Sequence, residues 1–460
     1  MPERYHIHVV PTKHRFERVG RSGTSDWRED CSRCKSCVKL RCLYDNYESE
    51  GDYNRDPSEP VEPVFECKAC LSCVQGCTKG LLSMALNPEY QALGDHYWKP
   101  EIIATTWDQA EAGRIPVSGA GYRGPFSGPG FDAMWTDMSE IVRPTRDGIH
   151  GREYINTSVD IGANPSQLLF DVKGALQNQS LLVEVQLPVL LDAAPWGDAG
   201  ENILKARIKA AAALKTLAVI KAGHLPAVPA EERCHTLPVF EGQEGPECLE
   251  ALAQCRLVEV ADGPECLALV EQLRKVKKDL LVGVRLPLTP EAAARVLELH
   301  EAGVPVVHLC ADFRGRELSA EKPRFVKEML REIHGVLVKK GVRNEMTLIA
   351  GGGIALAEHT IKAIICGADM VAVDIPLQVA LGCRVCGHNG FCPVGISEVP
   401  LPYAVQRMVN LMRAWHSQML EMLGAMGIRE VRRLRGEVGR AMFMEDLERD
   451  AFKDLARSAG

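Results

Sequence analysis

Three features that would direct a chain away from the aqueous cytoplasm are missing from this sequence. There is no run of about 18 or more uncharged apolar residues, so no segment is expected to span a membrane. Residues 1–10 lack the charged-then-apolar arrangement of a secretory signal. No long basic block is present and the formal net charge is −7, which argues against nucleic acid as a partner. We therefore expect a cytoplasmic protein with no membrane span and no nucleic-acid partner.

Cysteine, by contrast, is abundant, with 17 residues in a chain of 460. Eight of these cysteines fall between Cys31 and Cys77. Disulfides are a poor explanation for a protein without an export signal, because the cytosol keeps thiols reduced. The cysteine-rich segment is therefore expected to ligate a metal ion or an iron–sulfur cluster.

The eight cysteines form two groups, one spaced C-x2-C-x2-C-x4-C and the other C-x2-C-x2-C-x3-C. Such runs are typical of [4Fe–4S] loops, and in two-cluster ferredoxins the fourth cysteine ligates the other cluster. We therefore assign one [4Fe–4S] cluster to Cys31, Cys34, Cys37 and Cys77, and the other to Cys67, Cys70, Cys73 and Cys42. Structural zinc is the alternative, since paired C-x2-C also suits tetrahedral sites. Zinc sites, however, seldom need three successive cysteines at this spacing.

A third group of cysteines occurs much later in the chain. Cys383, Cys386 and Cys392 lie in a glycine-containing segment, 382–396, and proline follows the last of them. This pattern predicts a third iron–sulfur cluster, either [3Fe–4S] or [4Fe–4S]. The alternative is a set of free thiols, because an isolated cysteine often behaves as a small hydrophobic residue.

The body of the chain alternates short apolar segments with helical ones. Expected strands lie within 181–191, 216–223, 256–263, 279–287, 304–313, 346–354 and 369–376, and expected helices within 201–214, 264–277, 290–302, 323–340 and 357–366. Repeated βα units of this length predict a mainly parallel sheet. A strand number near eight favours a closed (β/α)8 barrel. The lack of G-x-G-x-x-G after the first strand weighs against a dinucleotide-binding fold.

Two glycine-containing segments late in the barrel are candidates for binding phosphate. One is Gly351-Gly352-Gly353, and the other begins at Gly367-Ala368. Phosphate often binds after strands seven and eight of such barrels, where backbone N–H groups can approach it closely. The alternative is a tight turn that needs glycine for conformational reasons.

Several segments resemble the ferredoxin-fused, FMN-binding class of glutamate synthase large subunits. They are Trp98-Lys99-Pro100, Pro116-Val117-Ser118-Gly119, 134–162, 350–396 and 422–440, and the resemblance covers roughly residues 67–440. It implies a (β/α)8 barrel that carries FMN, a [3Fe–4S] cluster beside the flavin, and reductive amination of 2-oxoglutarate. Electrons would pass from the N-terminal clusters through the third cluster to FMN. A redox partner or NAD(P)H-oxidising subunit is implied. Since the chain begins Met1-Pro2 without a cysteine nucleophile, ammonia would be free or delivered by a separate glutaminase subunit.

The resemblance also implies roles for individual residues. Phosphate would bind at Gly352, Gly353, Gly367 and Ala368, and the flavin loop after the first strand would contain Ala194 and Trp196. At the catalytic positions, His224 replaces a glutamate of the family and Arg285 replaces a substrate-binding lysine. Arginine is not a neutral substitute for lysine, because its guanidinium is planar and always charged. The spacing of the third cysteine group also differs from the family's usual C-x5-C-x4-C.

From these patterns we expect four regions and weigh three functions. The regions are a ferredoxin-like domain with two clusters (1–95), a linker and barrel-entry segment (96–165), the FMN-binding barrel (166–400) and a C-terminal helical extension (401–460). The first function is glutamate-synthase-like oxidoreduction. The alternative is an electron-transfer subunit of a larger redox complex with a degenerate oxoacid site. The third is a structural subunit that retains only the ferredoxin clusters.

Overall fold

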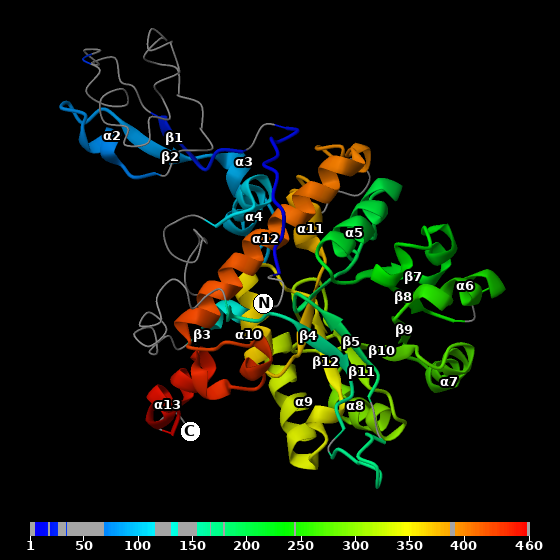
Figure 1. The fold of residues 1–460 in the computed structure, drawn as a ribbon. Helices are drawn as coiled ribbons and strands as arrows, with labels where there is room; N and C mark the ends of the chain where they lie inside the picture. The colour runs from blue at the N-terminus through cyan, green and yellow to red at the C-terminus, as the bar shows by residue number, and fades with distance from the viewer. Residues whose placement is uncertain are drawn as a thin grey trace. The chain divides into compact units, whose positions relative to one another are not determined.

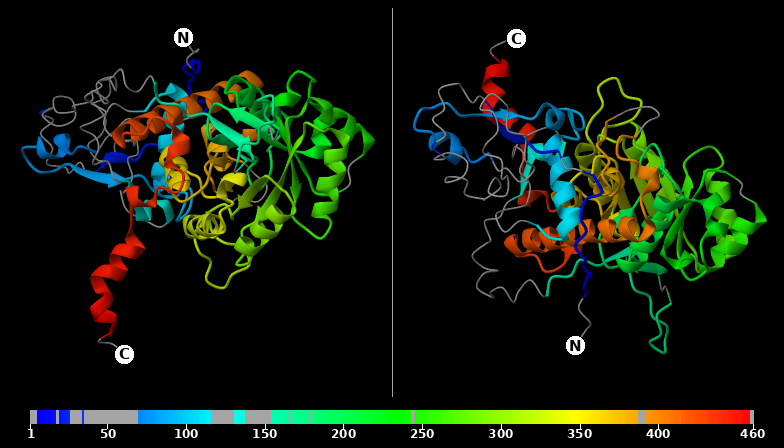
Figure 2. Two further views of the ribbon diagram at one scale, coloured as in Figure 1. Left: turned by 60° about the horizontal axis from the view of Figure 1, so that its bottom comes forward. Right: turned by 90° about the horizontal axis from the view of Figure 1, so that it is seen from above.

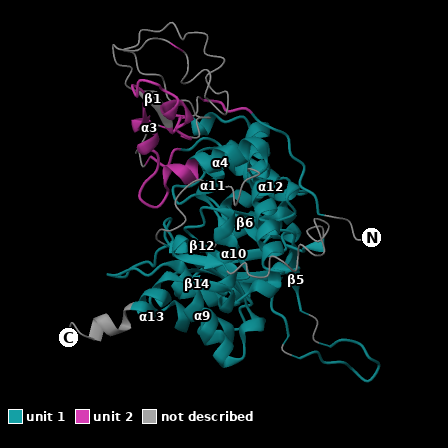
Figure 3. Cartoon of the chain, turned by 90° about the vertical axis from the view of Figure 1, so that its left-hand side faces the viewer, with its two compact units in different colours: residues 1–12, 104–383, 395–460 teal, residues 13–103, 384–394 magenta. Residues whose placement is uncertain are grey.

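The computed structural model describes residues 5–16, 19–25, 34, 69–115, 130–136, 154–165, 167–177, 180–242, 245–386 and 392–457, with the side chains of 22–25 and 452–457 left out. The chain divides into two compact units (Figure 3). Unit 1 comprises residues 1–12, 104–383 and 395–460, and unit 2 comprises 13–103 and 384–394. The third cysteine loop is thus grouped with the N-terminal cysteine region. No helix within the described ranges has the length and apolar character needed to cross a membrane.

A closed barrel of parallel strands forms the centre of unit 1 (Figure 1). In chain order its strands are β6 (Val189–Leu191), β7 (Ala218–Lys221), β8 (Thr236–Phe240), β9 (Leu257–Ala261), β10 (Leu281–Pro287), β11 (Val306–Cys310), β12 (Thr347–Gly351) and β13 (Met370–Val373). Strand β13 pairs with β6 and thereby closes the barrel. The expectation of a (β/α)8 barrel is confirmed.

Helices follow the strands because each connection must return the chain to the same end of a parallel sheet. They are α5 (Glu201–Ala213), α6 (Pro246–Ala251), α7 (Cys266–Val276), α8 (Ala292–Glu301), α9 (Val326–Lys340), α10 (Ala357–Ile365) and α11 (Ile375–Ala380). Figure 2 shows these helices around the strands. Their buried faces and the apolar strand residues form one continuous core.

Two strand expectations were wrong in detail. Segment 181–191 is two strands, because β5 (Leu182–Val185) pairs antiparallel with β4 (Val159–Gly162) and only β6 enters the barrel. Pro188 precedes β6, and a proline has no N–H for a continued ladder. Strand β8 was not predicted. Pro238 stands at its centre, and proline within an apolar segment argues against an interior strand. Its remaining residues are buried, so the barrel tolerates the proline.

Helix α12 (Leu401–Ala425) is the main element of the C-terminal extension. Its methionines at helical spacing, Met408, Met412, Met419 and Met422, are all buried, as expected of a helix that packs on the barrel. Strand β14 (Ala441–Phe443) pairs with β3 (Met134–Thr136), and α13 (Met444–Arg457) ends the described chain.

The described part of unit 2 is small. Strand β1 (Ser22–Ser25) pairs antiparallel with β2 (Ser83–Leu86), and short helices α2 (Ser72–Gln75) and α3 (Pro88–Gln91) lie on either side of β2 in sequence. Helix α4 (Pro100–Ala112) begins in this unit and continues into unit 1. The N–H of Gly94 donates to the carbonyl of Arg384 at 3.0 Å, which joins the N-terminal region to the third cysteine loop within the unit.

Candidate functional site

Three cysteines of the second N-terminal group are described, together with one of the first. Cys34 and Cys70 are exposed, Cys73 is buried and Cys77 is partly buried. The other expected ligands, Cys31, Cys37, Cys42 and Cys67, lie outside the described residues. Assignment of two clusters to this region therefore remains a prediction.

The backbone around Cys70 and Cys77 is suited to bind a thiolate-ligated group. The N–H of Leu81 donates to Sγ of Cys77 at 3.3 Å and is the main cause that lowers the pKa of this thiol. Ala69 and Leu71, on either side of Cys70, have φ angles of 52° and 62°, in the left-handed region that non-glycine residues rarely adopt. Backbone strain of this kind is found where a loop must wrap a ligand.

The third cysteine group repeats one feature of the second. Val385 stands immediately before Cys386 and has a φ angle of 50°, close to that of Ala69 immediately before Cys70. The residue before the second cysteine is therefore left-handed in both pairs, Cys67 with Cys70 and Cys383 with Cys386. Residues 387–391, between Cys386 and Cys392, lie outside the described chain, so the third cluster also remains a prediction.

Inside the barrel, ionisable side chains from several strands form a connected network. Nη2 of Arg285 on β10 donates to Oδ2 of Asp192 after β6 at 2.7 Å, and its Nη1 lies 3.7 Å from Oε2 of Glu259 on β9. Nδ1 of His308 on β11 lies 3.0 Å from Oε1 of Glu259. The side chains of His308 and Glu259 are both fully buried. This arrangement compensates each buried charge with an opposite one.

The pKa values of residues in and beside this network are shifted in different directions. Burial opposes ionisation of Asp192, but the charge of Arg285 outweighs burial and holds the pKa of Asp192 below its usual range. Burial alone would lower the pKa of His308, yet Cys310 and Glu259 raise it to about 10. Asp374, after β13, has a pKa raised to about 7 by burial and by the nearby Asp192. Two neighbouring carboxyl groups at one end of the barrel thus differ in charge near neutral pH.

The backbone at the start of α11 has no remaining N–H donor in its first three positions. The N–H of Ile375 donates to Oδ1 of Asp374 at 2.6 Å. Pro376 has no N–H, and the N–H of Leu377 donates to the carbonyl of Asp374 at 3.0 Å. The side chain and the carbonyl of Asp374 therefore cap this helix start.

The predicted phosphate-binding glycines do not lie together. Gly352 and Gly353 follow β12 at the C-terminal end of the barrel, whereas Gly367 and Ala368 precede β13 at the opposite end. The N–H groups of Gly367 and Ala368 donate to the carbonyls of Ile364 and Ala363. The prediction that Gly367 and Ala368 bind phosphate was wrong, because a residue ahead of a parallel strand lies at the end remote from the strand's carboxyl terminus.

Gly352 and Gly353 are required by the packing of their own loop. Their φ angles are +91° and +71°. A Cβ on Gly352 would lie 2.5 Å from the carbonyl oxygen of Asp312, and one on Gly353 would lie 2.6 Å from Cα of Gly315. Conformation and close approach to loop 311–315 thus explain both glycines, and a role in binding phosphate stays a prediction.

The remaining predicted residues are placed unevenly. Arg285 lies inside the barrel, whereas His224 is exposed on the short 3-10 turn Ala222–Ala227 after β7. Trp196 is half exposed and its indole N–H donates to Oε1 of Gln378 at 2.7 Å, while Ala194 is buried. The structure supplies no contact between His224 and Arg285 that would make them act as a pair.

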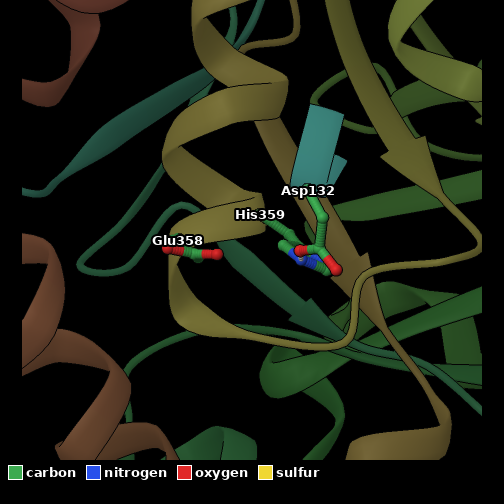
Figure 4. Close-up of side chains that lie close together, drawn as sticks. All are labelled: Asp132, Glu358 and His359. Atoms are coloured by element: carbon green, nitrogen blue, oxygen red, sulfur yellow. Dashed lines mark ion pairs between the residues drawn. The ribbon is translucent and has the colours of Figure 1, made fainter. Parts of the chain in front are cut away.

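Asp132, Glu358 and His359 form the group that most resembles a metal site among the described residues (Figure 4). Nδ1 of His359 accepts the N–H of Ala355 at 3.1 Å, so the neutral ring carries its proton on Nε2, which lies 3.6 Å from Asp132. A protonated nitrogen cannot ligate a metal ion. The ammonium of Lys362 lies 3.4 Å from Glu358, which supplies that carboxylate with a cation. These contacts account for the group without a metal.

Four residues of the barrel network were missed by sequence reasoning: Asp192, Glu259, His308 and Asp374. A usable signal existed for two of them, because Glu259 and His308 stand in the middle of buried apolar strands, where an ionisable residue needs a partner. For the two aspartates, which follow β6 and β13, their place at strand ends was the only indication.

The sequence of this chain is similar to those of glutamate synthases. The conserved region of glutamate synthase matches residues 246–429. An archaeal-type glutamate synthase (NADPH) of Dehalococcoides mccartyi is 24% identical over 93% of this chain and 94% of its own length. The archaeal glutamate synthase (NADPH) of Archaeoglobus fulgidus is 24% identical over 96% and 97%. A Methanocaldococcus jannaschii relative of the same description is 40% identical, but over 22% of each chain.

Solved structures resemble the chain only loosely. A mutant flavocytochrome b2 with pyruvate bound has a TM-score of 0.40 and 12% identity, covering 67% of this chain and 86% of that one. A lactate oxidase of Pediococcus acidilactici has a TM-score of 0.41 and 14% identity, covering 72% and 92%. Likeness at this level carries no inference about cofactor or substrate.

Proposed function

Because this chain contains the conserved region of glutamate synthase and is a distant relative of the archaeal-type enzymes, we propose that it is an iron–sulfur oxidoreductase of glutamate-synthase type. Its role in this proposal is to transfer electrons within a larger redox complex, with a barrel that no longer turns over an oxoacid. The main support for this proposal is the ion pair between Arg285 and Asp192. Arg285 is the cation expected to bind the substrate, and it is already bonded to a carboxylate of the chain itself.

The cysteine region supplies the redox part of this proposal. Cys70, Cys73 and Cys77 keep ligand spacing, and the N–H···S bond to Cys77 favours its thiolate. When bound there, [4Fe–4S] clusters would supply one-electron transfer. Around them, the chain's residues hold the thiolates in place and donate hydrogen bonds to sulfur, which tunes the potential of such a centre.

The barrel interior is poorly suited to a dicarboxylate such as 2-oxoglutarate. Arg285 already bonds Asp192 and lies near Glu259, so an incoming carboxylate would have to displace one of the chain's own carboxylates. The other cation, His308, is fully buried and contacts Glu259. A dianion would therefore enter a site whose positive charges are already compensated.

The family implies FMN, but the C-terminal end of the barrel, where the FMN phosphate is expected to bind, does not fit it. The first three positions of α11 offer no free N–H donor, and the carboxyl group of Asp374 caps the helix start. Gly352 and Gly353 pack closely against loop 311–315. No step of the proposed function is therefore assigned to a flavin.

A second candidate is FMN-dependent reductive amination of 2-oxoglutarate. It is favoured by the match to the conserved region of glutamate synthase and by the glycine loop at the C-terminal end of β12. The curated relatives carry NADPH in their names. Under either candidate, an NAD(P)H-oxidising subunit or another redox partner would deliver electrons. Only the second candidate needs ammonia, either free or from a separate glutaminase subunit.

The two candidates differ in one experiment on the full chain purified without oxygen. Iron content, reduction by dithionite followed by electron paramagnetic resonance, and glutamate formation from 2-oxoglutarate and ammonia are measured on the same preparation. We expect about eight to twelve irons, by the number of predicted clusters, and reducible centres without glutamate formation. Glutamate formation with stoichiometric FMN would establish the second candidate instead. Zinc in place of iron would contradict both.

A further inference from the structure

Asp374 has an unusual place at the C-terminal end of the barrel. It follows β13, the eighth barrel strand, and precedes the short helix α11, the position at which barrels of this type often bind phosphate. A phosphate bound there would need backbone N–H groups that point outward from the start of the helix. In this chain those groups are either absent or already bonded to Asp374, as at Ile375, Pro376 and Leu377.

The electrostatic surroundings of Asp374 lead to the same conclusion. Val373 pairs with Leu191, so the residues that follow them, Asp374 and Asp192, emerge side by side from neighbouring strands. The N–H of Asp192 donates to the carbonyl of Val373 at 2.8 Å, which holds the two strand ends together. Asp192 remains ionised because Arg285 bonds it. A phosphate would therefore meet two carboxyl groups where it needs donors.

We propose that Asp374 is a specificity-determining residue that excludes phosphate-bearing ligands, FMN among them, from the mouth of the barrel. The class of ligand left to this site is one without a phosphate group. This inference deepens the proposed function, since a barrel that rejects FMN cannot reduce an imine through it. It concerns the barrel alone and is independent of whether the cysteines bind clusters.

The test compares FMN and riboflavin, which share a ring system and differ in the phosphate. Both are titrated by flavin fluorescence into the full wild-type chain, Asp374→Asn and Asp374→Gly. Asparagine removes the negative charge but keeps a side-chain oxygen to cap Ile375, so the helix start should stay folded, whereas glycine also frees the N–H of Ile375. We expect FMN affinity to rise tenfold or more in the variants, while riboflavin affinity stays within twofold of wild type.

A matched control removes a carboxylate from the same end of the barrel without touching α11. Asp262 follows β9 and is bonded by Arg295 of α8 at 2.8 Å, so Asp262→Asn changes the overall charge equally. Its FMN affinity should remain that of wild type. The proposal is overturned if wild type purifies with stoichiometric FMN, if no Asp374 variant gains FMN affinity, or if riboflavin or the control gains as much.

Acidity supplies a second readout. Asp374 is faced by Asp192 from β6, by Arg285 from β10 and by the N–H of Ile375, and its carboxyl gains a proton as pH falls through about 7. Wild-type affinity for FMN should therefore approach that of Asp374→Asn as pH falls from 8 to 6. The FMN phosphate also ionises in this range, but its effect cancels in the ratio of the wild-type affinity to that of Asp374→Asn. A ratio independent of pH would contradict the proposal. A preparation without the expected iron would contradict the proposed function but not this inference about Asp374.

Discussion

Glu259 and His308 are the residues whose burial most constrains the barrel. Both side chains have no exposed surface, and Nδ1 of His308 lies 3.0 Å and 3.1 Å from the two carboxylate oxygens. Nε2 of His308 has no hydrogen-bond partner and approaches Gly351, where a Cβ would lie 2.8 Å from it. A histidine held in this way is restricted to one orientation, and any side chain at Gly351 would have to displace it.

Removal of His308 is expected to destabilise the barrel strongly. His308→Ala removes the nearer of the two cations beside the buried Glu259 and leaves Arg285 at 3.7 Å, so the free energy of unfolding should fall by up to about 3 to 5 kcal/mol, the usual cost of breaking a buried ion pair. His224→Ala, at an exposed histidine after β7, should change it by less than about 0.5 kcal/mol. Denaturant titration of both variants measures the difference. Equal stability of the two variants would show that the buried pair contributes nothing.

The same pair predicts a pH dependence with a definite sign. The folded-state pKa of His308 is raised from its usual value of 6.5 to about 10. Its stabilising contribution is therefore complete below pH 6.5 and is lost as pH rises through about 10. The difference in unfolding free energy between wild type and His308→Ala should shrink over this interval. A difference that grows with pH would contradict the assignment of a charged His308.

At the scale of elements, the loop after β12 illustrates how packing, and not ligand binding alone, can require glycine. Gly353 combines a left-handed backbone with a close approach to Gly315 in the loop after β11. A second glycine, Gly263 after β9, has open space around its missing Cβ. The two positions are therefore expected to respond differently to the same methyl group.

Gly353→Ala should lower the free energy of unfolding by at least about 1 to 2 kcal/mol, from the left-handed backbone alone. The clash with Cα of Gly315, 2.6 Å from an ideal Cβ, would add to this cost. Gly263→Ala should be neutral or slightly stabilising, because alanine restricts the unfolded chain. Thermal unfolding of both variants gives the comparison, and a tolerated Gly353→Ala would show that the loop relaxes freely.

Over the whole molecule, cysteines fall into two classes with different environments. Cys248, Cys255, Cys266 and Cys366, which have no ligand spacing, are buried in the barrel unit. Burial raises the pKa of Cys366 to about 12, which keeps it protonated and unreactive. Among the described cysteines with ligand spacing in unit 2, Cys34, Cys70 and Cys392 are exposed, Cys77 and Cys386 are partly buried, and Cys73 is buried.

Iron content should separate the two classes. Cys70→Ser is expected to lose up to about four irons, the content of one [4Fe–4S] cluster. Cys234→Ser, a partly exposed cysteine whose Sγ lies 3.5 Å from the carbonyl of Glu231, should retain all of its iron. Iron analysis and absorption near the visible cluster bands provide the measurement. Equal iron in both variants would contradict the predicted ligand set.

Periodicity and spacing were enough to establish the barrel, most of its helices and the cysteine runs, because these depend on residues close together in the chain. Strands β9 to β13 are examples, whereas β8 was missed because of a single proline. The sequence shows where the glycines are but not which of them lie at the C-terminal end of the barrel. Gly353 and Gly367 can be told apart only once the ends of β12 and β13 are known.

The charged network required the tertiary structure. Asp192 and Arg285 are 93 residues apart, and Glu259 and His308 are 49 apart, so only strand order and register bring them together. The same holds for Asp374 beside Asp192, which depends on closure of the barrel between β13 and β6. Local sequence therefore decided which elements form, while closure of the sheet decided which charges meet, because contact across a barrel is set by register and not by spacing along the chain.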